Sequence, residues 1–297
     1  MLNKINKYMN IENAKGLIEK LYVDSLDIIS VDPMVHPLRI IEASKSIIGI
    51  KPENPLEKLL LYCESKTTDI KLLKKKYDFS KSKLPEVVSL LNLEISLLDK
   101  DKKKSAKNIF YLTKVSDGLH ILEFLLEFSL KHCLQSYFLV WSIYRMERFL
   151  GLKYINRSLI LSVEYIINDI SEKRLNLNFD IDEYIFKNSF DLNLFHDVFT
   201  LYRISGEKFI RRNSIYPLVC SLVKDAKCNQ CEKPEYHVLD EQKEMGRHWI
   251  YKFVNNIKMK DLNDGLILNL DAARGTLKIL TDKDKINFIW SYLNKII

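Results

Sequence analysis

The sequence predicts an all-α protein, a multi-helix bundle of about a dozen helices around a buried central helical hairpin. The chain of 297 residues contains 8 Gly and 7 Pro, too few for the many tight turns of an all-β fold. Apolar residues recur with the period of a helix through most of its length. The Asp-Gly pairs at Asp117 and Asp264 lack the alternating flanks of β-hairpins, which favours turns that precede helices.

The N-terminal part contains four amphipathic segments, at 16–29, 36–48, 55–65 and 84–100. A dense run of charges, DKDKKKSAK at 99–107, follows them. Because such a run resists burial, it predicts an exposed linker or a frayed helix end. We therefore expect an N-terminal helical part at 1–98 and a main helical domain at 108–297, with one continuous domain as the alternative.

The segment at 118–151 is apolar almost throughout, which predicts a buried central element made of one very long helix or two packed ones. It is the centre of a core predicted at 108–170. Further amphipathic helices are predicted at 156–171, 190–205, 208–226, 237–257 and 281–296, with a polar connection at 171–184 and the weakest helical pattern at 264–280.

Composition places the chain among ordinary globular proteins, with 47% hydrophobic and 29% charged residues. The net charge of +7 permits an anionic partner without requiring one. An odd number of cysteines, five, and a polar N-terminus predict reduced thiols in a cytoplasmic protein. Charges such as Glu127 and Arg145 interrupt the apolar region, so no membrane span of roughly 20 residues is expected.

The first candidate site is His120, Glu123 and Glu127, which share one face of an otherwise apolar helix. Ionisable groups on a buried helix need partners or a cavity. One interpretation is a pocket in which these three residues are catalytic and transfer protons. The other is a buried ion-pair network with Arg145 and Arg148, and the sequence favours neither.

The second candidate is the stretch HVLDEQKEMGRH, in which His237, Glu241, Glu244 and His248 would share one helical face. Imidazole and carboxylate groups bind zinc or iron. The spacing matches neither H-E-x-x-H nor the Glu-x-x-His pairs of di-iron bundles, so a solvated polar stripe is the favoured interpretation.

The third candidate is the C-x-x-C pair of Cys228 and Cys231, which could hold zinc through thiolates with His237 and His248 as further ligands. These histidines lie outside the usual H-x₃₋₅-H spacing, so two loop thiols are the favoured alternative.

Several common motifs are missing from the sequence. It has no G-x-G-x-x-G, no P-loop and no G-x-S-x-G nucleophile elbow. Basic runs beside aromatic residues, at 71–79 and 207–216, suit nucleic acid, but no nucleic-acid-binding motif accompanies them. The pair His196-Asp197 lacks the further His and Asp positions of an HD-type metal site.

Four histidines occur at or near expected helix starts, in VHPLRIIEA, GLHILEF, FHDVFTLYR and GRHWIYKF. In these short stretches the chain resembles the questin oxidase-like family. That family is helical, and its relatives oxidise aromatic polyketides with a reduced nicotinamide cofactor. The resemblance implies oxidation chemistry, although this chain has no nicotinamide-binding signature.

Two hypotheses for function follow. In the first, the chain is an enzyme that oxidises a small apolar substrate in an interior pocket lined by His120 and Glu123, with His36, His196 and His248 also available. In the second, it is a non-catalytic helical module that binds a protein or nucleic acid. The enzyme requires these side chains to converge on a cavity, whereas the binding module predicts that they scatter. The sequence leaves the cofactor and the oligomeric state open.

Overall fold

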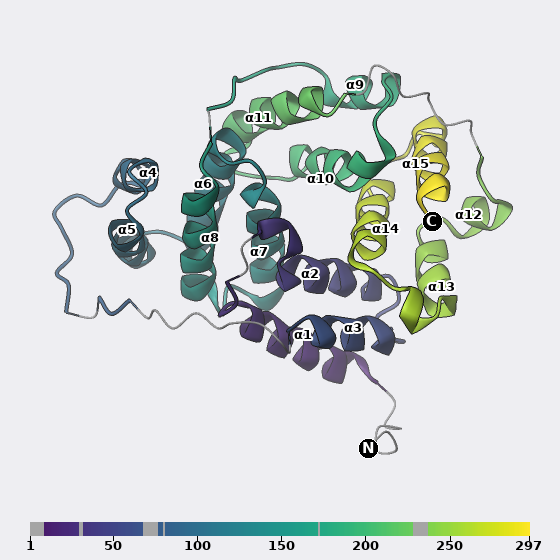
Figure 1. Ribbon diagram of the computed structural model, residues 1–297, viewed down its shortest axis with the longest axis horizontal. Coiled ribbons are helices and arrows are strands. Elements are labelled where there is room, and N and C mark those ends of the chain that lie inside the picture. The colour runs from purple at the N-terminus through teal and green to yellow at the C-terminus, as the bar shows by residue number, and fades with distance from the viewer. Residues whose placement is uncertain (1–8, 30–31, 68–76, 80, 172, 228–236) are drawn as a thin grey trace.

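A computed structural model describes residues 9–29, 32–67, 77–79, 81–171, 173–227 and 237–297. In these ranges the chain forms fifteen α-helices and three short 3₁₀-helices, with no strand, which confirms the all-α prediction. Figure 1 shows the helices arranged around the middle of the molecule. The α-helices are α1 Ile11–Ser25, α2 Pro37–Ile48, α3 Glu57–Thr67, α4 Leu90–Leu98, α5 Lys102–Val115, α6 Gly118–His132, α7 Ser136–Leu150, α8 Ile155–Asp169, α9 Ile181–Lys187, α10 Phe195–Ser205, α11 Arg212–Asp225, α12 Asp240–Met245, α13 His248–Asn256, α14 Asp264–Leu277 and α15 Lys283–Ile296.

The predicted central segment forms two packed helices, α6 and α7, rather than one long helix, and α8 packs against both. The turn between them is held by Asp169 at the end of α8. Its Oδ2 accepts hydrogen bonds from the backbone N–H groups of Gln135 and Ser136 at 2.8 and 2.7 Å. A carboxylate at this position satisfies the free N–H groups at the start of α7.

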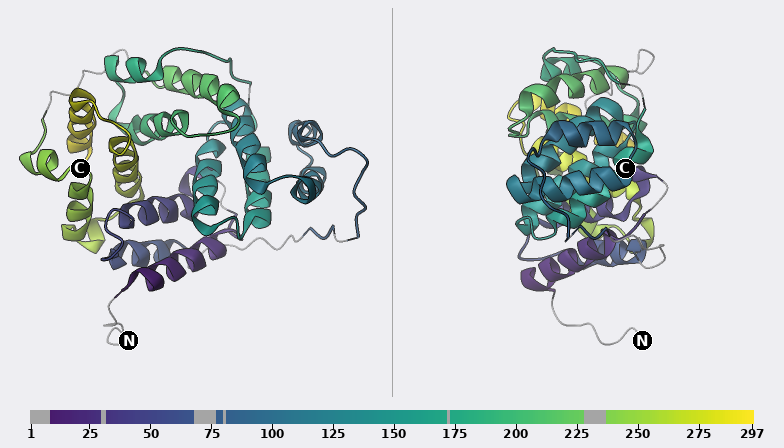
Figure 2. Two further views of the ribbon diagram at one scale, coloured as in Figure 1. Left: turned by 180° about the vertical axis from the view of Figure 1, so that it is seen from behind. Right: turned by 90° about the vertical axis from the view of Figure 1, so that its left-hand side faces the viewer.

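Helices α2, α7, α10, α11 and α14 pack in series on the other side of α7 from α6 and α8 (Figure 1). Helix α2 packs against α7 and α14, and α10 packs against α14 and α11 (Figures 1 and 2). Most side chains on these contacts are apolar and fully buried, including Leu38, Tyr144 and Phe199. Helices α2, α7, α10 and α14 also bury several charged side chains. These charged side chains form the site described below.

The charged run at 99–107 is a turn followed by the first residues of α5. Asp101 caps this helix, because its Oδ1 accepts the backbone N–H of Lys104 at 2.9 Å. Lys100 adopts the left-handed conformation that reverses the chain between α4 and α5, with φ of 55°. The lysines of the run thus begin a helix, and the proposed boundary between two domains remains a prediction.

The predicted single helix at 237–257 is wrong. Helix α12 ends at Met245, and α13 starts only at His248. Gly246 lies between them with φ of 54° and ψ of −139°, a conformation that glycine adopts without strain. The apolar pattern continued across the break, which hid the change of helix direction. In the ranges given above, no helix is both long and apolar enough to cross a lipid bilayer.

Candidate functional site

His120, Glu123 and Glu127, the candidate catalytic residues, line none of the cavities described below. His120 is exposed in the first turn of α6, whereas Glu123 is buried one turn later. The Glu123 carboxylate accepts the backbone N–H groups of Ile210 and Arg211 at 2.9 and 3.2 Å. Glu127 forms an ion pair with the Arg211 side chain. Both glutamates therefore hold the start of α11. The arginine that pairs with Glu127 is Arg211, whereas the expected partners Arg145 and Arg148 pair with Glu42 and Glu207.

Two of the four candidate metal ligands lie within the described residues, and both are exposed. Cys228 and Cys231 lie outside the described residues. His237 is exposed before α12, and His248 is exposed at the first residue of α13. The described part of the chain holds no group of three His, Cys, Asp or Glu side chains that could bind a metal ion. A zinc or iron site at these residues stays a prediction.

The stretch that suggested a shared histidine and glutamate face is solvated. Glu241 and Glu244 are both exposed on α12, and Glu241 pairs with Lys252 of α13 at 3.0 Å. The helix break at Gly246 places His248 on α13, whereas the two glutamates lie on α12.

His36 has a structural position. Its Nδ1 accepts the backbone N–H of Leu38 at 3.2 Å and so caps α2, while Nε2 donates to the carbonyl of Ile28 at 3.2 Å. This pattern requires the neutral imidazole. Burial, opposed in part by the bond to Ile28, lowers the pKa of His36 to about 4.

A group of buried charges that the sequence did not assign as a site lies between α2, α7, α10 and α14. At its centre, Asp271 of α14 is 4% exposed. Arg203 donates from Nη1 to Asp271 Oδ2 at 2.8 Å, and Arg274 donates from Nε to Oδ1 at 2.9 Å. Arg145 of α7 approaches Oδ2 at 3.4 Å. Burial alone would raise the pKa of the Asp271 carboxyl, but these three arginines lower it well below its usual range.

Glu42 of α2 supplies the second buried carboxylate. Its Oε1 accepts from Arg145 Nη1 at 2.8 Å and from the Ser46 hydroxyl at 2.8 Å. Lys45 lies 3.3 Å from the same oxygen. Burial opposes the charge on Glu42, but Arg145 and Lys45 outweigh it and lower the pKa of this carboxyl. Burial lowers the pKa of Lys45 to about 8.

A cavity of about 190 Å³ opens beside Asp271, and we call it the arginine cavity. It lies between α7, α10 and α14, with the α10 end and the start of the following turn forming one wall. Four basic side chains and one carboxylate contribute to its lining. The lining residues are Trp141, Arg145, Arg203, Gly206, Glu207, Arg274, Gly275, Lys278 and Ile279.

The carboxylate of this lining is already neutralised. Glu207 Oε1 accepts from Arg148 Nη1 at 2.7 Å. Because Asp271 is shared among three guanidinium groups, the cavity wall carries an excess of positive charge. Each guanidinium has five N–H donors. Among the described residues, the hydrogen bonds of Arg203 all come from Nη1, to the carboxylate and the carbonyl of Asp271.

Gly275 allows the Arg203 side chain to lie against α14. A Cβ atom at this position would be 2.1 Å from Arg203 Nε and 2.3 Å from its Cζ, far inside contact distance. Any side chain here would displace the guanidinium from the cavity wall. Glycine in a helix interior lowers helix stability. Its presence at 275 is explained by the close approach of the Arg203 side chain to the α14 backbone.

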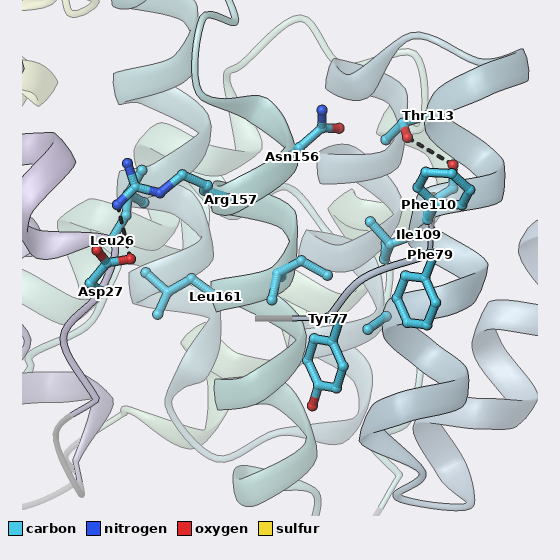
Figure 3. Close-up of a pocket in the computed structure, with 12 residues that line it drawn as sticks. Leu26, Asp27, Tyr77, Phe79, Ile109, Phe110, Thr113, Asn156, Arg157 and Leu161 are labelled. Carbon is cyan, nitrogen blue, oxygen red and sulfur yellow. Dashed lines mark hydrogen bonds and ion pairs between the residues drawn. The ribbon is translucent and has the colours of Figure 1, made fainter. Parts of the chain in front are cut away.

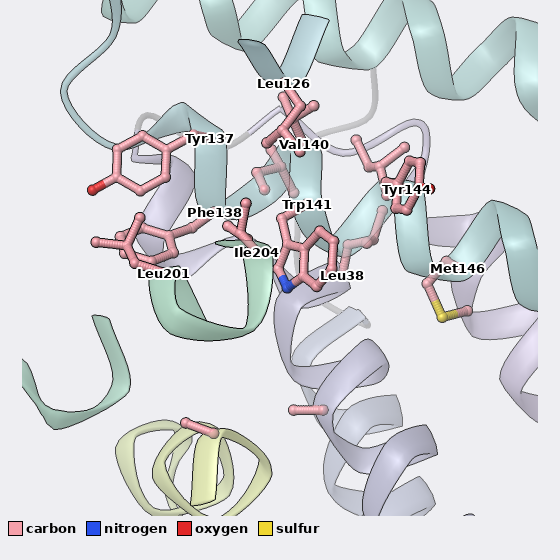
Figure 4. Packing of buried hydrophobic residues seen from close by; sticks show 14 of the residues in the cluster. Leu38, Leu126, Tyr137, Phe138, Val140, Trp141, Tyr144, Met146, Leu201 and Ile204 are labelled. Carbon is pink, nitrogen blue, oxygen red and sulfur yellow. The ribbon is translucent and has the colours of Figure 1, made fainter. Parts of the chain in front are cut away.

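Trp141 supplies a donor that has no acceptor. Its side chain is 3% exposed, and its Nε1 is buried with no hydrogen-bond partner within the described residues. Figure 4 shows the indole nitrogen on the side of the ring that faces away from Leu126 and Val140. The same residue lines the arginine cavity, and the Arg145 guanidinium lies 5.7 Å from its ring centre. A buried indole N–H normally has an acceptor.

A second, much smaller cavity of about 10 Å³ adjoins the first through Trp141 and Arg203, and His196 lines it. His196 Nδ1 lies 3.0 Å from Asp197 Oδ1, and Nε2 lies 3.3 Å from the Thr200 hydroxyl. Burial lowers the pKa of His196, against the raising effect of Asp197. Of the five histidines named above, His196 is the one that the structure places beside a polar cavity.

A larger apolar cavity of about 580 Å³ lies between α5 and α8 (Figure 3). Phe79 and Phe110 lie on one wall, with ring centres 5.9 Å apart. Leu161 lies on α8, and an ion pair of Arg157 with Asp27 at 2.9 Å closes one side. The residues that line this cavity among those described include no histidine or cysteine.

Comparison with protein-family models, with curated proteins and with solved structures finds no match to this chain.

Proposed function

We propose that the protein binds a small organic anion, a carboxylate or a phosphate monoester, in the arginine cavity. The observation that carries this proposal is the buried Trp141 indole N–H, which lacks an acceptor beside three arginines. An anionic oxygen in the cavity would accept from the indole and from the guanidinium groups together. Charge-assisted bonds of this kind are about twice as strong as neutral ones.

The size of the cavity limits the ligand. Pockets for drug-sized ligands have volumes of about 300–1,000 Å³, and the arginine cavity has about 190 Å³. A compact acid fits this space better than a nucleotide or a polyketide. Ile279 supplies the apolar part of the lining, so a short carbon chain would contact it while the acid group faces the arginines.

Thermal unfolding of the purified protein at low salt would test this proposal with phosphate, sulfate, succinate, citrate and glycerol phosphate. A binding anion should raise the melting temperature, because a ligand at 100 times its Kd stabilises the folded state by about 2.7 kcal/mol. Arg203→Gln should abolish the increase. Trp141→Phe, which keeps most of the packing and removes the N–H donor, should weaken it.

Arg212→Gln is the matched control, since Arg212 is exposed at the first residue of α11. This variant should respond to the anions as the unmodified protein does. Equal responses in Arg203→Gln and Arg212→Gln would place the effect on the general surface charge and reject the arginine cavity. A melting temperature that no anion in the set raises would also reject it.

Oxidation of a small apolar substrate is a separate proposal, and the apolar cavity between α5 and α8 is the space that suits such a molecule. Its lining of Phe79, Phe110 and Ile160 favours an aromatic or aliphatic compound. Thr113→Trp would fill this cavity and should abolish the binding of a fluorescent apolar probe such as anilinonaphthalene sulfonate. Probe binding that survives this change would argue against the apolar cavity.

A further inference from the structure

The helical hairpin of α4 and α5 stands out from one side of the molecule (Figures 1 and 2). The segment that leads into α4 and α4 itself expose large apolar side chains. Five of the nineteen exposed large apolar residues in the described chain lie within 84–98. They are Leu84 (51% exposed), Val87 (68%), Leu91 (62%), Ile95 (43%) and Leu98 (46%).

Three of these residues, Leu91, Ile95 and Leu98, form one stripe along α4, because they are four and three residues apart. The opposite face of α4 packs inward through Leu93, Ser96 and Leu97, which are fully buried. Helix α4 is therefore apolar on both faces. Only the inward face has a partner within the described residues.

The same hairpin carries an excess of lysine. Residues 84–107 contain five lysines and four acidic residues. One of the acids, Glu94, pairs with Lys131 of α6 at 3.7 Å. Lys103, Lys104 and Lys107 are exposed and have no ion pair among the described residues. The surface thus combines exposed aliphatic side chains with lysines that form no salt bridge within the described residues.

The apolar and basic parts adjoin each other. A groove of about 400 Å³ lies between the segment before α4 and the first half of α5. Val87 and Ile95 line one side of the groove, and Lys104 and Lys107 line the other. Exposed aliphatic side chains and lysines therefore border the same groove.

We propose that this surface, residues 84–107, docks the protein onto an anionic membrane surface. Helices that lie in a membrane interface combine an apolar face with lysines on their flanks, and each lysine near an anionic bilayer contributes attraction. The composition disfavours a protein partner. The centres of protein interfaces are depleted in lysine and enriched in Tyr, Trp and Arg. Residues 84–107 contain five lysines and no arginine, and Tyr111, an aromatic residue that lines the groove, is only 8% exposed.

Co-sedimentation of the full chain with vesicles would test this inference. We expect the protein to sediment with vesicles of equal parts phosphatidylcholine and phosphatidylglycerol, but not with phosphatidylcholine alone. Added salt should weaken the binding, because the lysine attraction is screened. Leu91→Glu combined with Ile95→Glu should reduce the binding at least tenfold, and both sites are exposed enough to accept the change without unfolding.

Lysine variants test the electrostatic part of the same surface. Lys103→Gln, Lys104→Gln and Lys107→Gln together should weaken binding, by about fivefold for each lysine near the bilayer. The matched control is Leu175→Glu, since Leu175 is 76% exposed in the connection after α8. This variant should bind vesicles as the unmodified chain does.

Three outcomes would overturn the inference. One is the absence of sedimentation with either kind of vesicle. Another is equal binding by Leu91→Glu/Ile95→Glu and by Leu175→Glu, which would place the contact elsewhere. The third is a dimer in analytical ultracentrifugation that Leu91→Glu/Ile95→Glu dissociates, because the stripe would then join two copies of the chain. Arg203→Gln should leave vesicle binding unchanged, so this test and that of the arginine cavity are independent.

Discussion

Replacing Gly275 with alanine should destabilise the protein, although alanine is the better helix former. Gly275 lies inside α14, where its missing side chain leaves room for the Arg203 guanidinium. The new Cβ would stand 2.1 Å from Arg203 Nε and 2.5 Å from Cδ. The arginine must therefore move, and its bond of 2.8 Å to Asp271 must lengthen or break.

The expected magnitude is the difference between two opposing effects. Alanine in place of glycine stabilises a helix interior by about 0.5–1 kcal/mol. A lost hydrogen bond to a charged, buried group costs about 1.5–3 kcal/mol. The loss is limited because Arg274 and Arg145 stay with Asp271. We therefore expect a net decrease in the free energy of unfolding of about 1–2 kcal/mol.

Urea unfolding followed by circular dichroism measures this change, with Gly16→Ala as the control. Gly16 is in the interior of α1, and nothing lies within 4 Å of its new Cβ. It should gain about 0.5–1 kcal/mol from helix propensity. A Gly275→Ala protein that is as stable as Gly16→Ala would refute the reasoning.

A double-mutant cycle isolates the contact itself. In an Arg203→Ala background the new Cβ of Gly275→Ala has no guanidinium to displace. The second substitution should then be neutral or slightly stabilising. Additive effects of the two substitutions would show that the close approach of Arg203 to Gly275 does not determine the result.

Further predictions concern groups away from the cavity. His36→Asn should flatten the pH dependence of the free energy of unfolding, which urea unfolding between pH 4 and 6.5 measures. The neutral His36 contributes about 3 kcal/mol. This contribution is present above pH 6.5 and is lost as the pH falls toward the pKa of about 4. Glu123→Ala should lower the free energy of unfolding by about 1–3 kcal/mol, because two backbone N–H groups lose their acceptor. His120 is exposed, so His120→Ala should change this free energy by less than about 0.5 kcal/mol. Equal losses in the two variants would contradict these assignments. Tyr22→Phe should cost about 1.5–3 kcal/mol, because the Tyr22 hydroxyl donates to the buried Glu147 at 2.7 Å, and an unchanged urea midpoint would count against that bond.

The fold class follows from periodicity because the apolar period of a helix does not depend on tertiary context. The central hairpin was predictable for the same reason, since its sequence is apolar on nearly every face. The break at Gly246 was not, because apolar residues continue in phase from Met245 to Ile250. A single glycine there is compatible with a helix, and only the tertiary position of α13 decides its conformation.

The candidate site was harder to predict than the fold. Arg145 was expected as the partner of a glutamate, but the glutamate it contacts is Glu42 of α2, about a hundred residues earlier in the chain. Arg203 and Asp271 each stand in a helix that is otherwise largely apolar, and this was the available signal. A charged residue in an apolar helix predicts a buried charge but does not identify the residue that pairs with it. Partners on different helices are determined by tertiary packing and not by their spacing in the sequence.

The energetics of the buried cluster favour a ligand over a purely structural role. A buried ion pair often stabilises a protein no better than apolar side chains of equal volume, because desolvation offsets the attraction between the charges. The cluster contains four positive charges, three arginines around Asp271 and Lys45 beside Glu42, but only two carboxylates to neutralise them. The unbonded Trp141 N–H adds a further desolvation cost of about 1–3 kcal/mol. One anion bound in the arginine cavity would supply the missing negative charge, and it would reduce both costs if its oxygen also accepted from the Trp141 indole N–H.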